Sequence, residues 1–135
     1  MSATMMKDLP LSKVYQLLEP GPVVLLTTAH KGRANVMTMS WHMMVEFEPP
    51  LVACVVSNRD HSFRALRATK ECVIAIPAVE LAPVVVEIGN CSGRDVDKFE
   101  AFHLTPSTKA PQVRLCSRSS DNGVCRLGVP RSECP

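Results

Sequence analysis

A short segment near the start of the chain has the pattern of a tight β-hairpin, and it constrains the fold more than any other feature. Residues 23–29 read VVLLTTA, and such Val- and Thr-rich runs favour a β-strand. His-Lys-Gly-Arg follows at 30–33, where a glycine between two apolar runs is typical of a hairpin turn. A second strand is expected to begin near Ala34. The chain therefore starts its fold with an antiparallel pair of strands.

The second strand shows a regular alternation of side chains. One face is expected to carry Asn35, Met37, Met39, Trp41 and Met43, and the other Val36, Thr38, Ser40, His42 and Met44. The first face combines an amide, thioethers and the only tryptophan of the chain. Such a surface suits a flat, polarisable ring system whose edge needs hydrogen bonds. A methionine-rich core strand is the alternative.

The remaining elements alternate between strands and short helices. Beyond a break at Glu46–Pro50, the pattern predicts a strand at Leu51–Ser57 buried on both faces, a helix from His61 or Ser62 to Lys70, a strand at Cys72–Ile76, a helix around Pro83 at Val79–Ile88 and a helix at Asp95–Phe102. A short helix at Lys13–Leu18, capped by Ser12, is expected before the hairpin. This order predicts a mainly β fold with peripheral helices, in the form of a small barrel or a curled mixed sheet.

Length and charge limit the classes of function. With 135 residues, 46% of them hydrophobic and 21% charged, the chain has the composition of one globular domain. A net charge of +2 is too small to indicate a nucleic-acid-binding protein. Residues 1–104 hold ten Lys or Arg and eleven Asp or Glu, whereas residues 105–135 hold five and two. We therefore expect a domain at 1–104, followed by an atypical basic tail rich in Ser, Arg and Cys at 105–135.

Targeting and metal signals are not evident. No apolar run reaches the length of about 18 residues that a membrane span needs, and the first residues do not resemble a secretory signal. A cytoplasmic protein without a membrane partner is expected. The six cysteines are then expected to be reduced thiols, and their spacing matches no zinc site.

A polar junction at SNRDHS, residues 57–62, ends one predicted strand and opens the next helix. Backbone N–H groups at a helix start favour an anion, and Arg59 and two serine hydroxyls lie beside them. A phosphate site is one hypothesis. The other is a capped helix start, with Asp60 or Ser62 as the cap and Arg59 in solvent.

Four motifs together resemble the flavin reductase-like, FMN-binding split-barrel family, in particular its flavoredoxin-like branch. The matching segments, between residues 18 and 105, are EPGPVVLLTT, NVMTMSWHMMVEFEPPLVACVVSNRDHSF, ECVIAIP and SGRDVDKF. The resemblance implies an FMN-binding split β-barrel that forms a homodimer. It also implies the residues that hold FMN: Asn35 and Trp41 at the ring edge or ribityl chain, Met39 and Ser40 through their backbone, Ser57, Asn58, Arg59 and Ser62 at the phosphate, and Lys98 reaching the flavin. Without the resemblance, Lys98 would be read as a surface lysine.

The function implied by the resemblance is hydride transfer from NAD(P)H to flavin, with no catalytic side chain required. An FMN-binding electron-transfer or flavin-carrier module is the alternative, and a remnant of the fold that binds no flavin is a third possibility. Family members usually continue with further strands after the DKF helix, whereas here the basic tail follows. We therefore expect a barrel that is incomplete at its C-terminal end. A change of reading frame would produce such a tail, and translation of the other frames tests that hypothesis.

Overall fold

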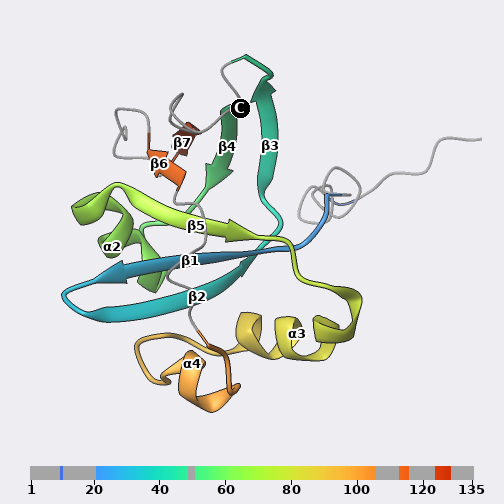
Figure 1. The fold of residues 1–135 in the computed structure, drawn as a ribbon, viewed down its shortest axis with the longest axis vertical. Coiled ribbons are helices and arrows are strands. Elements are labelled where there is room, and N and C mark those ends of the chain that lie inside the picture. Colours follow the sequence, from blue (N-terminus) through green and yellow to red (C-terminus); the bar gives the residue numbers. More distant parts are fainter. Residues whose placement is uncertain (1–9, 11–20, 49–50, 106–112, 116–123, 129–135) are drawn as a thin grey trace, which may run out of the picture.

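In the computed structural model, the chain folds into one antiparallel sheet with helices around it. The structure describes residues 10, 21–48, 51–105, 113–115 and 124–128. The strands are β1 (Val24–His30), β2 (Arg33–Met39), β3 (His42–Glu46), β4 (Leu51–Val55), β5 (Glu71–Ala75), β6 (Val113–Leu115) and β7 (Val124–Gly128). The helices are α2 (His61–Thr69), α3 (Ala82–Asn90) and α4 (Lys98–Ala101), with a 3₁₀ turn, η2 (Val79–Leu81), before α3 (Figure 1). The helix expected at Lys13–Leu18 lies outside the described residues.

The predicted hairpin is confirmed. β1 and β2 pair in an unbroken register from Val24 opposite Met39 to His30 opposite Arg33. The two residues between them, Lys31 and Gly32, have φ values of 51° and 75°. Two consecutive positive φ angles define the type I′ turn, whose twist matches that of the paired strands.

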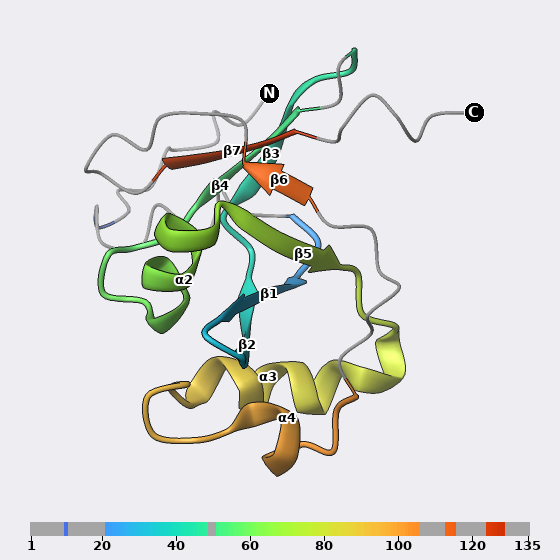
Figure 2. The ribbon, with the colours of Figure 1, turned by 60° about the vertical axis from the view of Figure 1, so that its left-hand side comes forward.

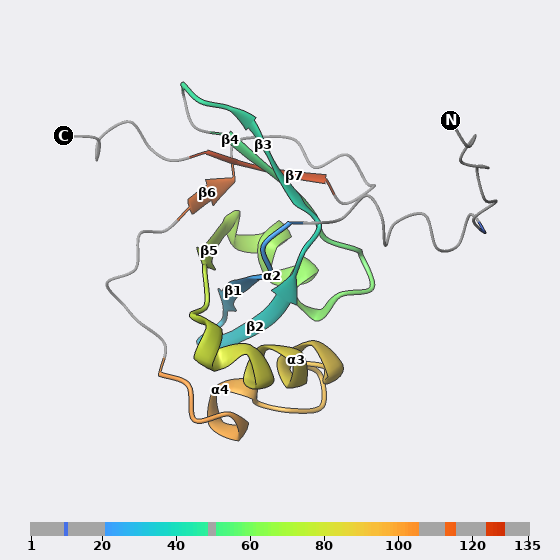
Figure 3. The ribbon, with the colours of Figure 1, turned by 90° about the vertical axis from the view of Figure 1, so that its right-hand side faces the viewer.

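The strand order is β2-β1-β5-β6-β7-β4-β3, and every described pair is antiparallel. The described pairs therefore form an antiparallel sheet and not a mixed one, with β2 and β3 at the two ends of the strand order. Figure 1 shows β3 and β4 running across the direction of β1, β2 and β5. Figures 2 and 3 show α3 and α4 at the end of the molecule next to β2, with β3, β4, β6 and β7 at the other end.

The second strand does not continue to Met44 as expected. β2 ends at Met39, and β3 begins at His42 and pairs with Cys54 of β4 instead. Met39 lies opposite Val24, the first residue of β1. The residues after Met39 therefore have no residue of β1 to pair with. Ser40 and Trp41 carry the chain from one part of the sheet to the other. The predicted face therefore ends at Met39.

Two other expectations need correction. The strand at Leu51–Val55 is not buried on both faces, because Val55 is 43% exposed although Cys54 is only 1% exposed. The helix expected at Asp95–Phe102 shortens to α4, because Asp97 caps its start. The carboxylate of Asp97 accepts hydrogen bonds from the backbone N–H groups of Phe99 (3.0 Å) and Glu100 (3.3 Å).

The segment from residue 105 contributes two strands to the sheet. β7 pairs with β4 along Leu51–Val55, and β6 joins β5 to β7. The sequence predicted an atypical basic tail here and no strands, because the apolar periodicity that usually marks strands is weak in this segment. The division into a domain at 1–104 and a tail stays a prediction.

The hydrophobic core lies between α2 and the inner face of the sheet. Its buried members are Val24, Leu26, Met39, Cys54, Val56, Phe63, Leu66 and Cys72. The other face of the β1–β2 hairpin contacts α3, where the Thr38 hydroxyl donates to the Val85 carbonyl (2.6 Å). Because β2 is held between two helices, its central residues have fixed positions.

Candidate functional site

Two adjoining cavities open beside β2 and the start of α2. The smaller has a volume of about 270 Å³ and the larger about 670 Å³. They share five lining residues: Asn35, Asp60, His61, Gly93 and Arg94. The two cavities therefore form one continuous hollow, which we call the β2–α2 hollow.

Asn35 joins two of the segments that line the smaller cavity. Its Nδ2 donates to the Ser62 Oγ at 2.8 Å, and the Ser62 side chain is only 1% exposed. A hydrogen bond between buried side chains from distant segments fixes both rotamers. The bond therefore ties the centre of β2 to the first turn of α2.

Gly93 brings the third segment against the other two. A Cβ at this position would collide with the Asn35 amide oxygen and would lie 2.9 Å from the His61 Cδ2. Only glycine allows the backbone to approach this closely. The loop after α3 is thus packed directly on the Asn35 side chain.

The first turn of α2 has no side-chain cap. Asp60 occupies the N-cap position, but its carboxylate accepts a hydrogen bond from the Ser57 backbone N–H (2.8 Å) and makes no cap bond to the helix. The hydroxyl of Ser62 accepts from Asn35. Neither residue therefore acts as the side-chain cap that the second hypothesis required. The N-terminal end of a helix carries a partial positive charge, which favours an anion.

Lys98 lies in the wall of the smaller cavity and is only 5% exposed. Its ammonium donates to the Ile88 carbonyl at 2.8 Å, in the last turn of α3. Burial lowers the pKa of Lys98 from its usual value, and the nearby Cys91 partly opposes this effect. An ammonium has three N–H donors, so after the bond to Ile88 the other N–H groups can still donate to a ligand.

Positive charge is concentrated around His61. Burial lowers the pKa of His61, and the charges of Arg94, Arg33, Lys98 and Arg64 lower it further. The Arg94 guanidinium also donates to the Arg59 carbonyl, which joins the loop after α3 to the start of α2. A neutral imidazole in this cationic surrounding indicates a site suited to an anionic ligand.

The structure brings together four of the residues predicted to bind FMN. Asn35, Arg59, Ser62 and Lys98 all line the smaller cavity, and Asn58 lines the larger one. Ser57 is exposed next to them, and its Oγ accepts from the Arg59 backbone N–H (3.2 Å).

The other three predicted residues line neither cavity. Met39 is in the core, as the methionine-rich core alternative predicted for its side chain. Ser40 and Trp41 form the crossing between β2 and β3, and Trp41 is 53% exposed. Their backbone carbonyls accept from His42 (2.9 Å) and Val55 (2.9 Å), respectively. Their contacts with a flavin stay predictions.

Sequence reasoning missed several residues of the hollow. Gly93 and Arg94 belong to the SGRDVDKF motif, so the family resemblance was a signal that could have found them. His61 was expected only as a possible first residue of the helix that follows the SNRDHS junction. Thr28, Arg33 and Arg64 have no distinctive sequence context, and only the fold brings them together.

Other site types are not seen in the described residues. Cys54 and Cys72 are buried and Cys91 is half-buried, and no group of His, Cys, Asp or Glu in this part of the chain could hold a metal ion. None of the described helices is both long and apolar enough to cross a membrane.

The model of the flavin reductase-like domain matches residues 17–125 of the chain. The chain belongs to the flavin reductase-like family. This match includes β1 to β5 and extends beyond residue 104 into the segment that holds β6 and β7. It also includes all residues that line the β2–α2 hollow.

The chain is also similar to curated proteins over most of its length. The uncharacterized protein YddH of Escherichia coli is 36% identical over 102 residues, which cover 74% of this chain and 53% of YddH. The chain spans about half the length of the curated relatives it matches.

Two solved structures share the fold. Flavoredoxin of Desulfovibrio vulgaris superposes with a TM-score of 0.71 at 20% identity, over 96% of this chain and 73% of flavoredoxin. An FMN-binding protein from Thermus thermophilus superposes with a TM-score of 0.72 at 18% identity, over 98% and 78%. The fold of this chain is thus the mainly β split-barrel fold of FMN-binding flavin reductase-like proteins.

Proposed function

We propose that this protein is an FMN-binding oxidoreductase of the flavin reductase type, which passes hydride from NAD(P)H to flavin. One observation supports this most directly. The uncapped N-terminus of α2 opens beside a cavity that Asn35, Arg59, Ser62 and Lys98 line together, although they come from three separate segments. Membership of the flavin reductase-like family and the likeness to FMN-binding structures point to the same cofactor.

The residues of the hollow fit the chemical groups of FMN. The phosphate would lie at the start of α2, where Ser57, Asn58, Arg59 and Ser62 gather and where the uncapped N-terminus of the helix favours an anion. The ring system would lie along β2, with Asn35 and Trp41 at its edge and with backbone contacts from Met39 and Ser40. Lys98, still with donor capacity, would reach the flavin from α4. Bound FMN would supply the hydride-accepting chemistry.

The side chains have binding and orienting roles in this proposal. The Asn35–Ser62 bond and the close packing of Gly93 hold the walls of the cavity in one geometry before ligand arrives. The Arg59 guanidinium and the Lys98 ammonium, which line the smaller cavity, would stabilise negative charge on the bound cofactor. No side chain is required to act as acid or base.

The proposal is tested with the purified protein and added FMN. Quenching of FMN fluorescence on titration is expected, and anaerobic NADH or NADPH is expected to bleach the flavin absorbance of the complex. Binding without bleaching by either nucleotide, but with bleaching by dithionite, would favour the electron-transfer module instead. A protein that binds no FMN would contradict both functions.

Arg59 provides the first mutational test. Arg59→Ala removes a guanidinium from the proposed phosphate site, and we expect FMN affinity to fall by roughly 1–3 kcal/mol in binding free energy. Arg59 is exposed, and both of its described hydrogen bonds use backbone atoms, so the fold is expected to persist. Arg67→Ala is the matched control, because Arg67 is an exposed arginine of α2 that lines neither cavity. Equal FMN affinity in the two variants would place the phosphate elsewhere.

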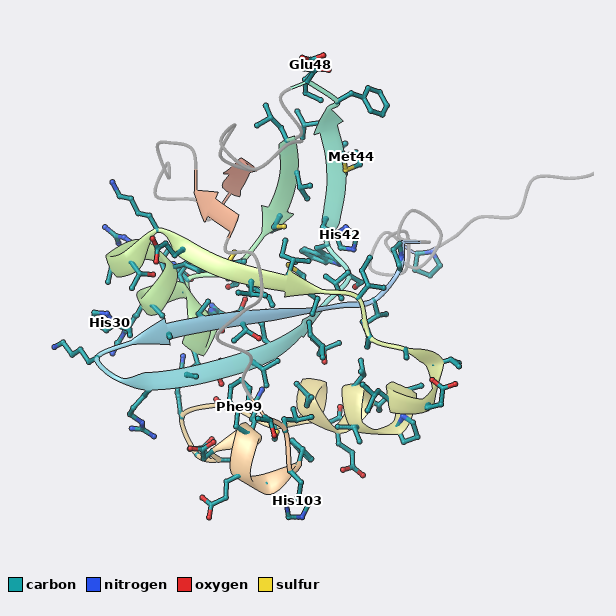
Figure 4. The ribbon with its side chains drawn as sticks, viewed as in Figure 1. His30, His42, Met44, Glu48, Phe99 and His103 are labelled. Carbon is teal, nitrogen blue, oxygen red and sulfur yellow. The ribbon has the colours of Figure 1, made fainter. Side chains whose placement is uncertain are left out.

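A homodimer is the expected assembly, and the β3 strand offers a surface for it. Exposed apolar side chains gather on β3 and next to it: Trp41 (53% exposed), Met43 (64%), Met44 (57%), Val45 (49%) and Phe47 (86%). Figure 4 shows Met44 on β3, at the end of the molecule away from α3. Exposed apolar side chains concentrated in one segment are typical of protein–protein contacts. We propose that a second copy of the chain covers them.

A further inference from the structure

The larger cavity of the β2–α2 hollow has a lining unlike that of the smaller one. It extends from the shared residues toward the tip of the β1–β2 hairpin, where His30, Lys31 and Arg33 line it. Figure 4 shows His30 at this end of β1, on the same side of the molecule as α2. Arg64, one turn into α2, lines the same cavity. Cationic side chains from two elements therefore face one space.

These cations lack acidic partners in the described part of the chain. Two carboxylates line the cavity, those of Asp60 and Asp97. Both are used locally: Asp60 accepts from the Ser57 N–H, and Asp97 caps α4. Neither forms an ion pair with Arg33 or Arg64. Clustered cations repel one another, so the arrangement is more favourable with an anion between them.

A buried hydroxyl in the same lining is also without a partner. Thr28 is 2% exposed and lines the larger cavity, and its Oγ1 makes no hydrogen bond. The register places Thr28 directly opposite Asn35, so both side chains lie on the face of the hairpin turned toward α2. Buried polar atoms are almost always bonded, and an unpaired one calls for an explanation such as a missing ligand. A phosphate oxygen is an acceptor that a threonine hydroxyl can satisfy.

The charge exceeds what FMN alone would use. FMN carries one phosphate, and the proposed function places it at the start of α2 with Arg59 and Ser62. Arg33 and Arg64 line only the larger cavity, whereas Arg59 and Ser62 line only the smaller one. Two arginines that line one cavity from different elements are suited to bind a phosphate through their planar donor groups.

We propose that the larger cavity is a second phosphate subsite, which binds a phosphate group of an adenine dinucleotide rather than the phosphate of FMN. This inference rests on the proposed function. Two dinucleotides could place such a group here. NADPH would bind beside FMN and contribute the 2′-phosphate of its adenosine, and FAD would bind in place of FMN and contribute the phosphate of its adenylate. Arg33, Arg64 and Thr28 would then determine which nucleotide the protein prefers.

Calorimetric titration separates the two sources. The FMN-saturated protein is titrated with adenosine 2′,5′-bisphosphate and with AMP, and the flavin-free protein with FAD and with FMN. The compared pairs are adenosine 2′,5′-bisphosphate with AMP, and FAD with FMN. In at least one pair, the first ligand, which has the additional phosphate, is expected to bind about tenfold more tightly than the second. A preference for the bisphosphate identifies the NADPH phosphate as the occupant, and a preference for FAD identifies the adenylate.

Variants then test the residues. Arg33→Ala and Arg64→Ala are expected to remove the preference while changing FMN affinity less than twofold, and Arg67→Ala, on the same helix, is expected to preserve it. No preference in either pair for the unmodified protein would overturn the proposal. So would an Arg64→Ala variant that loses FMN as severely as Arg59→Ala, because the cavity would then hold the phosphate of FMN. If the protein binds no FMN, the proposed function fails, but the bisphosphate and AMP titrations of the flavin-free protein still test the subsite.

Discussion

Gly93 controls the shape of the hollow through the absence of a side chain. Its backbone lies against Asn35 and His61, two residues that line both cavities. A larger residue would have to move the Asn35 amide, which holds the Ser62 hydroxyl. The effect of a substitution here is therefore expected to reach the binding site as well as the stability.

Gly93→Ala is expected to weaken FMN binding at least tenfold and to lower the free energy of unfolding by about 1–3 kcal/mol, as overpacking usually does. Fluorescence titration and urea unfolding measure the two effects. Gly89→Ala is the control for the stability measurement, because a Cβ there would lie 3.5 Å from the Thr38 Cβ, an ordinary contact. Unchanged FMN affinity in Gly93→Ala would show that Asn35 need not keep its position.

His61 gives the site a pH dependence with a definite sign. Its pKa in the folded protein lies below the usual 6.5, owing to burial and to nearby cations, Arg94 first among them. As the pH falls, the imidazole of His61 therefore binds a proton at a higher pH in the unfolded chain than in the folded protein. The contribution of His61 to stability is complete above pH 6.5 and is lost as the pH falls through the lowered pKa.

Removing Arg94 tests the cause of this shift. Arg94→Ala is expected to raise the pKa of His61 toward 6.5, as followed by NMR titration of the imidazole protons. Arg67→Ala should leave the pKa of His61 as it is in the unmodified protein, since Arg67 is not among the charges that shift it. An unchanged His61 titration in Arg94→Ala would assign the shift to burial and the remaining cations rather than to Arg94.

Sequence patterns gave the elements of the site but not the contacts between them. The SNRDHS junction was identified correctly as a strand-to-helix turn, because its residue types favour turns and helix starts. The pairing of Asn35 with Ser62 spans 27 positions in the chain, and no local pattern encodes such a distance. The uncapped state of α2 also escaped prediction, because Asp60 is a favourable N-cap residue whose carboxylate binds the preceding loop instead.

Among the elements, α3 and α4 are joined by a buried charge. Lys98, the first residue of α4, donates to the Ile88 carbonyl near the end of α3. Carbonyls in the last turn of a helix lack intrahelical partners, and a cation there also opposes the helix dipole favourably. This bond holds the loop at residues 91–97 against β2, with Gly93 within it.

Lys98→Met keeps most of the side-chain length but removes the donor. We expect the flavin-free protein to lose about 1–3 kcal/mol in free energy of unfolding, because the buried Ile88 carbonyl is left unpaired. Urea unfolding measures this loss, with Glu100→Gln, an exposed change on the same helix, as the control. Equal stability of the two variants would mean that water replaces the ammonium at no cost.

Strand boundaries were predicted well where turn chemistry marks them and poorly where tertiary pairing decides. The Lys-Gly turn at 31–32 and the Pro83 helix start both follow from local conformational rules. The end of β2 at Met39 does not, since residues 40–44 continue the same alternation. β2 ends where β1 has no further residue to pair with it, so its end is determined by another segment of the chain and not by its own residues.

For the whole molecule, the exposed apolar surface on β3 is the feature that a single chain does not explain. The variant Met43→Lys/Phe47→Asp is expected to be monomeric in size-exclusion chromatography with light scattering, whereas the unmodified protein is expected to be a dimer. Both side chains are largely exposed, so the fold should tolerate the change. Val86→Lys, which alters an exposed apolar residue of α3, is the control and should remain dimeric. A monomeric unmodified protein would contradict the proposed assembly.

The pairing of β4 with β7 has a consequence for how the protein folds. The β1–β2 hairpin joins residues only a few positions apart, so it can form within microseconds. By contrast, Val55 pairs with Val124, a contact between distant parts of the chain that carries a large loop-closure cost. During synthesis, at roughly 5–20 residues per second, β4 emerges several seconds before its partner. Throughout that interval one edge of β4 is open to strands of other nascent chains, so this edge is where chaperone protection would matter most.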